Sequence, residues 1–232
     1  MTDADAATTT LVRFRLPDPP EREPDEVTSY EFVYAPGDPL HLARHFARPQ
    51  STLIVADRWI AAQPGYTPLR RPDLLIAFDV DPALYHEQNG YVISDQGKPP
   101  DFVLEVASES TAAIDVGPKR EEYAALGIRE YWRFDSTGEF HGSRLAGDRL
   151  VADQYEPIPI VELSAGVLQG ESEALGLWLR WEHGELGWYD PQTGRHIPTF
   201  DSEHEARIEA EARVRELETR LRRLEEEPPP SR

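Results

Sequence analysis

The run Asp-Phe-Val-Leu-Glu-Val-Ala at residues 101–107 decides the fold of this chain. It is compact and apolar, and Pro99 and Pro100, which cannot join a central ladder, precede it, so we predict a buried strand that begins after them. One acid, Glu105, lies inside the run. Because a buried carboxylate is costly without a partner, Glu105 is expected to have a nearby cation, a metal or a raised pKa. The alternative is an edge-facing glutamate paired with an arginine.

A helix and a second strand are predicted directly after this run. Gly117 and Pro118 open the helix and Gly127 ends it, an arrangement of proline and glycine that is typical of helix ends. The aromatic run at residues 128–135 then predicts a strand. A strand, a helix and a strand with short connections imply a right-handed crossover, so the two strands are expected to be parallel neighbours.

Upstream, the sequence predicts one helix and two more strands. The helix opens at Asp38 and Pro39 and ends before Pro49. Residues 52–56 and 74–80 are short apolar runs rich in branched side chains and bounded by turn-forming residues, as buried strands are. The pattern as a whole predicts an α/β (α+β) fold with a mixed sheet flanked by helices.

Composition divides the chain into five predicted segments. They are a disordered N-terminal segment (1–26), a core (27–138), a β-hairpin extension packed on the core (139–200), a C-terminal helix (201–227) and a tail (228–232). The first segment is rich in proline and acidic residues and cannot bury much apolar surface. The third has short aromatic or branched runs separated by turn sequences, which is typical of successive hairpins.

The C-terminal helix carries the pattern of a coiled coil. Ala210, Val214, Leu217, Leu221 and Leu224 recur at alternating spacings of four and three residues, amid glutamate and arginine. Two heptads are marginal for a helix on its own. The sequence leaves two interpretations open: a homodimer through this helix, or a solvated helix that folds back on its own body.

The charge balance of the chain is strongly acidic. The formal net charge is -19 with a pI near 4.7, and residues 201–232 hold ten acids and seven bases, a net of -3, which leaves -16 on residues 1–200. This charge opposes binding to a polyphosphate backbone, so nucleic-acid binding would need a local basic patch or divalent cations.

Cysteine usage and apolar patterning indicate the compartment. The chain has no cysteine, which excludes disulfides and cysteine-bound zinc, so any metal must be held by oxygen or imidazole. No run approaches the length of a membrane span, and Asp3 and Asp5 stand where a signal peptide would carry basic residues. We expect a soluble cytoplasmic protein without a membrane partner.

Three residues form a candidate site: Asp73 at a strand entry, Glu105 inside the later strand, and Lys119 at the start of the helix. Alone, an aspartate at a strand entry such as Asp73 is more often a turn or capping residue. Lys119 alone could equally be a surface lysine. Together, two carboxylates from adjacent strands make an oxygen-rich site for Mg²⁺, with Mn²⁺ as a substitute, and an ammonium can orient water or stabilise charge on a phosphoryl oxygen. Tyr123, one turn after Lys119, is predicted to pack into the core.

The same residues resemble a known family. The motifs are Pro72-Asp73, Pro100-Asp101-Phe102-Val103-Leu104-Glu105-Val106-Ala107-Ser108, Asp115-x-Gly117-x-Lys119-Arg120-x-x-Tyr123 and Gly127-Ile128-x-Glu130-Tyr131-Trp132-x-x-Asp135. In order and spacing they resemble the restriction endonuclease family often called Uma-two, which is placed in the PD-(D/E)XK nuclease superfamily. The likeness is dense over residues 72–135 and looser elsewhere.

The resemblance implies a restriction-endonuclease-like core in which Asp73 and Glu105 bind Mg²⁺ and Lys119 completes a catalytic triad. The superfamily motif places a lysine two residues after the glutamate, where this chain has Ala107. The resemblance therefore suggests that the lysine has moved to the helix, at Lys119.

The resemblance also implies supporting residues around this triad. For the acid that the family carries on an N-terminal helix, Glu31 and Asp57 are the candidates. Ser108 and Tyr123, which belong to the matching motifs, are candidates for a supporting role.

Three functions follow as hypotheses. The first is an Mg²⁺-dependent endonuclease that hydrolyses phosphodiester bonds of DNA through metal-activated water. The second is a weak or inactive nuclease-fold module that acts in binding or regulation through coiled-coil assembly, which the acidic body favours. The third is a metal-dependent hydrolase of another phosphodiester or of a small molecule.

Overall fold

The computed structural model describes residues 14–20, 30–65 and 69–226, and within them the side chains as far as residue 223. The expected tail and most of the expected N-terminal segment lie outside these residues. Residues 14–20, which the composition predicts to be disordered, instead lie against the body. Leu16 is buried beside Ala61 and Val92, and its N–H donates to the carbonyl of Gln88 at 2.8 Å. Apolar packing of Leu16 and Phe14, with hydrogen bonds from Asn89, thus fixes a stretch whose average composition is polar.

A six-stranded mixed sheet forms the centre of the body, in the order β1-β3-β5-β6-β7-β8. The strands are β1 (Thr52–Val55), β3 (Leu74–Phe78), β5 (Phe102–Val106), β6 (Glu130–Phe134), β7 (Leu145–Val151) and β8 (Gln154–Ile158). β5 and β6 are parallel, as the strand-helix-strand pattern predicts, and the remaining neighbours are antiparallel. The predicted α+β fold with a mixed sheet is confirmed.

Helices flank this sheet, together with a short parallel pair formed by β2 (Ile60–Ala61) and β4 (Tyr91–Val92). The helices before α6 are η1 (Tyr30–Tyr34), α1 (Asp38–Phe46), α2 (Pro82–Gln88), α3 (Ile93–Gln96), α4 (Ala112–Val116) and α5 (Pro118–Ala125). α1 and α5 are the two helices that proline and glycine predict. In the described part of the chain, no helix combines the length and the apolar character needed to span a membrane.

A second, antiparallel sheet has the order β13-β12-β11-β10-β9. Its strands are β9 (Ile160–Ser164), β10 (Val167–Ser172), β11 (Leu177–Glu182), β12 (Glu185–Asp190) and β13 (Arg195–His196). Hairpins therefore do follow residue 139, but the first, β7–β8, extends the main sheet. The boundary expected at residue 138 falls inside that sheet, because β7 continues the hydrogen-bonded ladder beyond β6.

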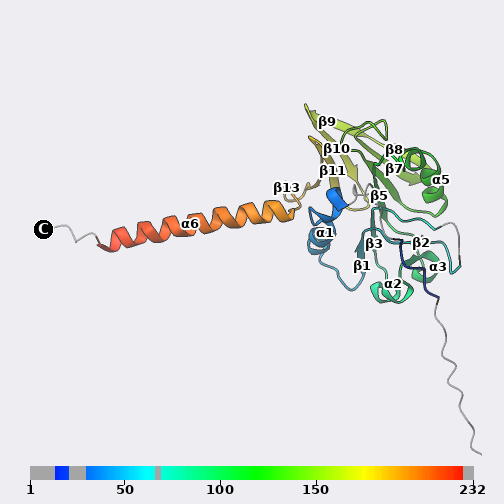
Figure 1. The fold of residues 1–232 in the computed structure, drawn as a ribbon, viewed down its shortest axis with the longest axis horizontal. Coiled ribbons are helices and arrows are strands. Elements are labelled where there is room, and N and C mark those ends of the chain that lie inside the picture. The colour runs from blue at the N-terminus through cyan, green and yellow to red at the C-terminus, as the bar shows by residue number, and fades with distance from the viewer. Residues whose placement is uncertain (1–13, 21–29, 66–68, 227–232) are drawn as a thin grey trace, which may run out of the picture.

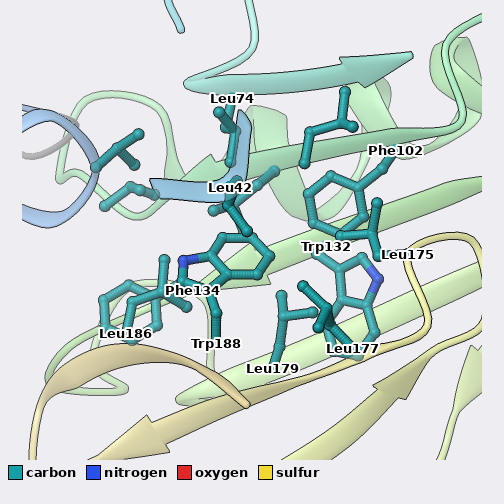
Figure 2. Packing of buried hydrophobic residues seen from close by; sticks show 14 of the residues in the cluster. Leu42, Leu74, Phe102, Trp132, Phe134, Leu175, Leu177, Leu179, Leu186 and Trp188 are labelled. Atoms are coloured by element: carbon teal, nitrogen blue, oxygen red, sulfur yellow. The ribbon is translucent and has the colours of Figure 1, made fainter. Parts of the chain in front are cut away.

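The larger hydrophobic core lies between the two sheets (Figure 2). Trp132 of β6 is fully buried there, and it fits because glycines face it from both sheets. A Cβ atom on Gly147 would lie 2.9 Å from the Trp132 ring, and one on Gly170 would lie 2.7 Å from it. A second cluster, which includes Val103, Tyr123 and Tyr131, covers the side of the main sheet next to α5.

Helix α6 (Phe200–Glu226) extends away from the body (Figure 1). Its described side chains are exposed along its whole length. The expected C-terminal helix is therefore present, and of the two interpretations left open by the sequence, folding back on the body is not the arrangement observed.

Candidate active site

β3 and β5 bring Asp73 and Glu105 to the same face of the sheet. The strands are antiparallel, with Leu74 opposite Leu104. Continuing this register by one residue puts Asp73 opposite Glu105, and directly opposed residues in an antiparallel pair point to the same face. The Oδ2 atom of Asp73 accepts a 2.7 Å hydrogen bond from the N–H of Val106, which fixes this carboxylate at the end of β5.

Asp73, Glu105 and Lys119 line one open pocket. Their elements are far apart in the sequence, so the pocket is a product of the tertiary fold. Its lining residues are Asp57, Leu69, Arg70, Arg71, Asp73, Glu105, Val106, Ser108, Thr111 and Lys119. The structure therefore brings together the three residues on which the sequence prediction depends.

Lys119 forms ion pairs with two buried carboxylates. Its Nζ atom lies 2.9 Å from Oε2 of Glu105 and 2.7 Å from Oδ1 of Asp115. Burial alone would lower the pKa of Lys119, but the two carboxylates raise it above its ordinary value, so the side chain remains an ammonium. These pairs offset the unfavourable position of a lysine in the first turn of a helix.

Glu105 is buried among groups that stabilise its charge and groups that oppose it. The hydroxyl of Tyr123 donates a 2.7 Å hydrogen bond to Oε1. Burial, helped by the charges of Asp73 and Asp115 and opposed by Lys119 and Tyr123, raises the pKa of Glu105 from 4.5 to about 8. An additional cation in the pocket would favour the ionised carboxylate.

Asp115 is a site residue that the sequence prediction missed. It is fully buried, its Oδ2 atom accepts a 2.8 Å hydrogen bond from Thr111, and the same atom lies 3.2 Å from Nε2 of His141. Burial works to raise the pKa of Asp115, but the contacts with His141 and Lys119 outweigh it and hold the pKa below the usual range. The available signal was its place in the motif Asp115-x-Gly117-x-Lys119, four residues before the lysine. His141 comes from the loop after β6, and no sequence pattern indicated that it would reach the site.

Ser108 lines the pocket, whereas Tyr123 and Ala107 are buried and are not among its lining residues. Ser108 lines the pocket, and its Oγ atom lies 2.8 Å from Oγ1 of Thr111, so it supports the start of α4. Tyr123 is fully buried, which confirms the predicted packing, and it also bonds to Glu105. Ala107 is buried at the end of β5 and donates its N–H to the carbonyl of Phe134 at 2.8 Å.

Of the two acids considered for the N-terminal position, only Asp57 lines the pocket. It follows β1, in a turn with φ of 55°. Glu31 is exposed on η1 and is not among the residues that line this pocket. The reason is that η1 turns Val33 into the core and packs Phe32 on Phe134, which leaves Glu31 directed to solvent.

Two arginines contribute positive charge to the pocket. Arg70 forms a two-atom ion pair with Glu122 of α5, which neutralises much of its charge. The guanidinium of Arg71 lies 5.7 Å from the centre of the Trp59 ring and donates to the carbonyl of Pro20 at 3.2 Å. Their side chains are thus held by protein contacts at the rim.

The donor atoms of the pocket suit a hard cation. Asp73 and Glu105 offer carboxylate oxygens, and Mg²⁺ typically binds one or two carboxylates, keeps several waters and takes its other ligands from substrate phosphates. Among the residues that the structure describes, no group of three histidine, cysteine or acidic side chains is arranged to hold a metal. The carboxylate oxygens of Asp73 and Glu105 are of the donor type that a two-carboxylate Mg²⁺ site would use.

Comparison with known proteins identifies a family. A model of the Uma2 family, described as "Putative restriction endonuclease", matches residues 40–182, which include all three residues of the candidate triad. No curated protein matches the chain. Among solved structures, it is similar to the crystal structure of a "putative nuclease belonging to DUF820" from Anabaena variabilis ATCC 29413. The identity is 10%, the TM-score is 0.39, and the likeness covers 65% of this chain and 77% of that chain.

Proposed function

Because the chain belongs to the Uma2 family, we propose that it is a cytoplasmic, Mg²⁺-dependent endonuclease that hydrolyses phosphodiester bonds of DNA. One observation carries the proposal. Two carboxylates from neighbouring strands and one ammonium group line the same open pocket, at Asp73, Glu105 and Lys119. Hydrolysis of a phosphodiester requires a bound cation, an activated water and stabilisation of the negative charge that develops on phosphoryl oxygens.

Each residue has a role in this proposal. Asp73 and Glu105 would hold Mg²⁺, which when bound supplies a Lewis acid and lowers the pKa of water. Lys119 donates hydrogen bonds to the attacking water or to a phosphoryl oxygen. Tyr123 fixes the orientation of the Glu105 carboxylate, and Asp115 fixes that of the Lys119 ammonium.

The acidic body limits how the chain would hold DNA. Because the chain has a formal net charge of -19, it has no long-range electrostatic attraction to a phosphate backbone. Contacts would be local, through Arg71 and Lys119 at the pocket and through divalent cations. We therefore expect weak DNA binding without Mg²⁺ and clear binding with it.

The test is cleavage of DNA by the purified full chain with Mg²⁺, with and without EDTA. We expect Asp73→Asn and Glu105→Gln each to reduce cleavage by roughly 100-fold or more, because each amide keeps the size of the carboxyl group and loses its charge. Glu109→Gln is the matched control, since Glu109 is exposed just beyond β5 and does not line the pocket. Circular dichroism and urea unfolding check that all variants fold.

Two outcomes separate the competing functions. Cleavage that persists in both site variants, or that ignores EDTA, would remove the proposed mechanism. Cleavage of simple phosphodiesters in a substrate panel, with no action on DNA, would support hydrolysis of another phosphodiester.

A second candidate function is a binding or regulatory module that assembles through α6. The observations that favour it are the acidic body and the ion pair that neutralises Arg70 at the rim of the pocket. In this case the chain would self-associate or bind a partner and would show no metal-dependent activity on any nucleic acid.

A further inference from the structure

Helix α6 presents a continuous apolar stripe to solvent. Val214, Leu217 and Leu221 are 53%, 48% and 57% exposed. None of these side chains contributes to the hydrophobic clusters of the body. An exposed apolar stripe on a helix of 27 residues indicates an interaction surface.

The stripe has the spacing of a coiled-coil seam. Ala210, Val214, Leu217 and Leu221 alternate between the d and a positions of a heptad repeat. In a parallel coiled coil, a β-branched residue at a, here Val214, combined with leucine at d, here Leu217, favours two strands.

The charges beside the seam select the orientation of the two helices. The e positions hold Glu211 and Glu218, and the g positions hold Arg213 and Arg220. In a parallel pair each g residue lies beside an e residue of the other helix, so Arg213 of one copy meets Glu218 of the second copy. In an antiparallel pair e faces e and g faces g, which opposes glutamate with glutamate and arginine with arginine. The sequence of α6 is therefore complementary to itself only in the parallel orientation.

We propose that α6 pairs with α6 of a second copy as a parallel, in-register coiled coil, which places the two bodies at the same end of the pair. The body is fixed to the first turn of α6, where the N–H of Phe200 donates to the carbonyl of Pro36 at 2.9 Å and the Phe200 ring lies 5.0 Å from that of His41. The seam begins at Ala210, roughly 15 Å further along the helix at 1.5 Å per residue. It is therefore clear of the contacts that fix the body.

This pairing does not depend on nuclease activity. If the proposed function also holds, the two active sites belong to bodies at one end of the dimer, an arrangement that suits cleavage of both strands of a duplex. Because association is measured without substrate, failure of the pairing and failure of the nuclease proposal give different results.

The first test is sedimentation velocity of the full chain over a range of concentrations at physiological salt. We expect a reversible shift from a monomer of 26.3 kDa to a dimer, in the micromolar range because the seam is short. Leu217→Asp should weaken the association by roughly tenfold or more. Thr219→Asp is the matched control, since it adds the same charge at an f position on the opposite side of the helix, and it should dimerise like the parent chain.

The second test fixes the orientation by cross-linking. The chain contains no cysteine, so an engineered cysteine forms the only disulfide available. Ala210→Cys and Leu221→Cys, made separately, should each form a disulfide-linked dimer under mild oxidation, because identical positions face each other in a parallel, in-register pair. Thr219→Cys should form little.

The results that overturn the proposal are distinct. A monomer at every concentration excludes pairing through α6. Cross-linking at only one of the two seam positions, or at neither when the dimer forms, excludes the parallel register. A larger oligomer excludes the two-stranded form. Unchanged circular dichroism and thermal unfolding of the body in each variant exclude misfolding as the cause.

Discussion

The buried carboxyl group of Asp38 should make the stability of this protein depend on pH. Asp38 begins α1, is 2% exposed, and accepts a 2.7 Å hydrogen bond on Oδ2 from Nε1 of Trp188 in β12. Burial raises the pKa of Asp38 from 3.8 to about 7, and the hydrogen bond from Trp188 only partly opposes this rise. The contact joins α1 to the second sheet, close to the place where α6 meets the body.

The sign and the size follow from linkage between protonation and folding. In the unfolded chain this group titrates near 3.8, so between that pH and about 7 the folded protein binds one proton more than the unfolded chain. The contribution of Asp38 to the free energy of unfolding is therefore fully present below about pH 4 and is lost as the pH rises to about 7. About three pH units at 1.36 kcal/mol each give a loss on the order of 4 kcal/mol.

Urea unfolding between pH 4 and pH 8 tests this on the parent chain and on Asp38→Asn. The amide keeps an oxygen that accepts the Trp188 hydrogen bond but does not titrate. From pH 4 to pH 8 the free energy of unfolding of the variant should therefore rise by about 4 kcal/mol relative to that of the parent. Asp79→Asn, at an exposed aspartate, is the control and should keep the profile of the parent. If Asp38→Asn keeps that profile too, the reasoning that a buried proton resides on Asp38 is wrong.

Three further predictions concern the site and the core. Asp115→Asn removes a charge that holds Lys119, so kcat/KM for Mg²⁺-dependent cleavage should fall by roughly 100-fold; unchanged kinetics would show that the ion pair does not position the ammonium. Tyr123→Phe removes the hydroxyl that donates to Glu105, so urea unfolding should show a loss of about 1 to 2 kcal/mol, and equal stability would contradict the 2.7 Å hydrogen bond. Gly147→Ala places a methyl group about 2.9 Å from the buried Trp132 ring. It should destabilise the protein by about 1 to 3 kcal/mol, with a change in tryptophan fluorescence; neither change would be seen if the ring had space to move.

Local patterns were sufficient to predict the centre of the fold. The strand β5 follows from an apolar run after two prolines, and α5 follows from Pro118 and Gly127. Glu105 was predictable because a lone charge in an apolar strand requires a partner. The parallel pairing of β5 and β6 follows from the handedness of the crossover.

Other features depend on contacts that no local pattern specifies. His141 reaches Asp115 because the loop after β6 is folded around Asp135, whose carboxylate accepts hydrogen bonds from the N–H groups of Phe140 and His141. In the same way, the sequence after residue 139 predicts hairpins but not which sheet they join, and Ala146-Gly147-Asp148, which has the composition of a turn, lies inside β7. Whether Glu31 or Asp57 lines the pocket depends on which face of η1 packs inward, and this cannot be read from the sequence.

The position of the lysine shows how such contacts shape the site. In the nuclease motif that the sequence resembles, the lysine is on the strand, two residues after the glutamate, so the strand itself sets its direction. In this chain that residue is Ala107, and Lys119 approaches Glu105 from α5. The direction of its ammonium group is then set by Asp115, which is itself fixed by Thr111 and His141.

A lysine on a helix therefore depends on packing that a lysine on a strand does not need. Because Asp115 is fully buried and its Oδ1 atom lies 2.7 Å from Nζ of Lys119, the packing of α4 beside α5 holds the ammonium group near Glu105. His141 lies in a different part of the sequence, yet it belongs to this support. The residues that position the ammonium group of Lys119 thus extend beyond the motif, into the loop after β6.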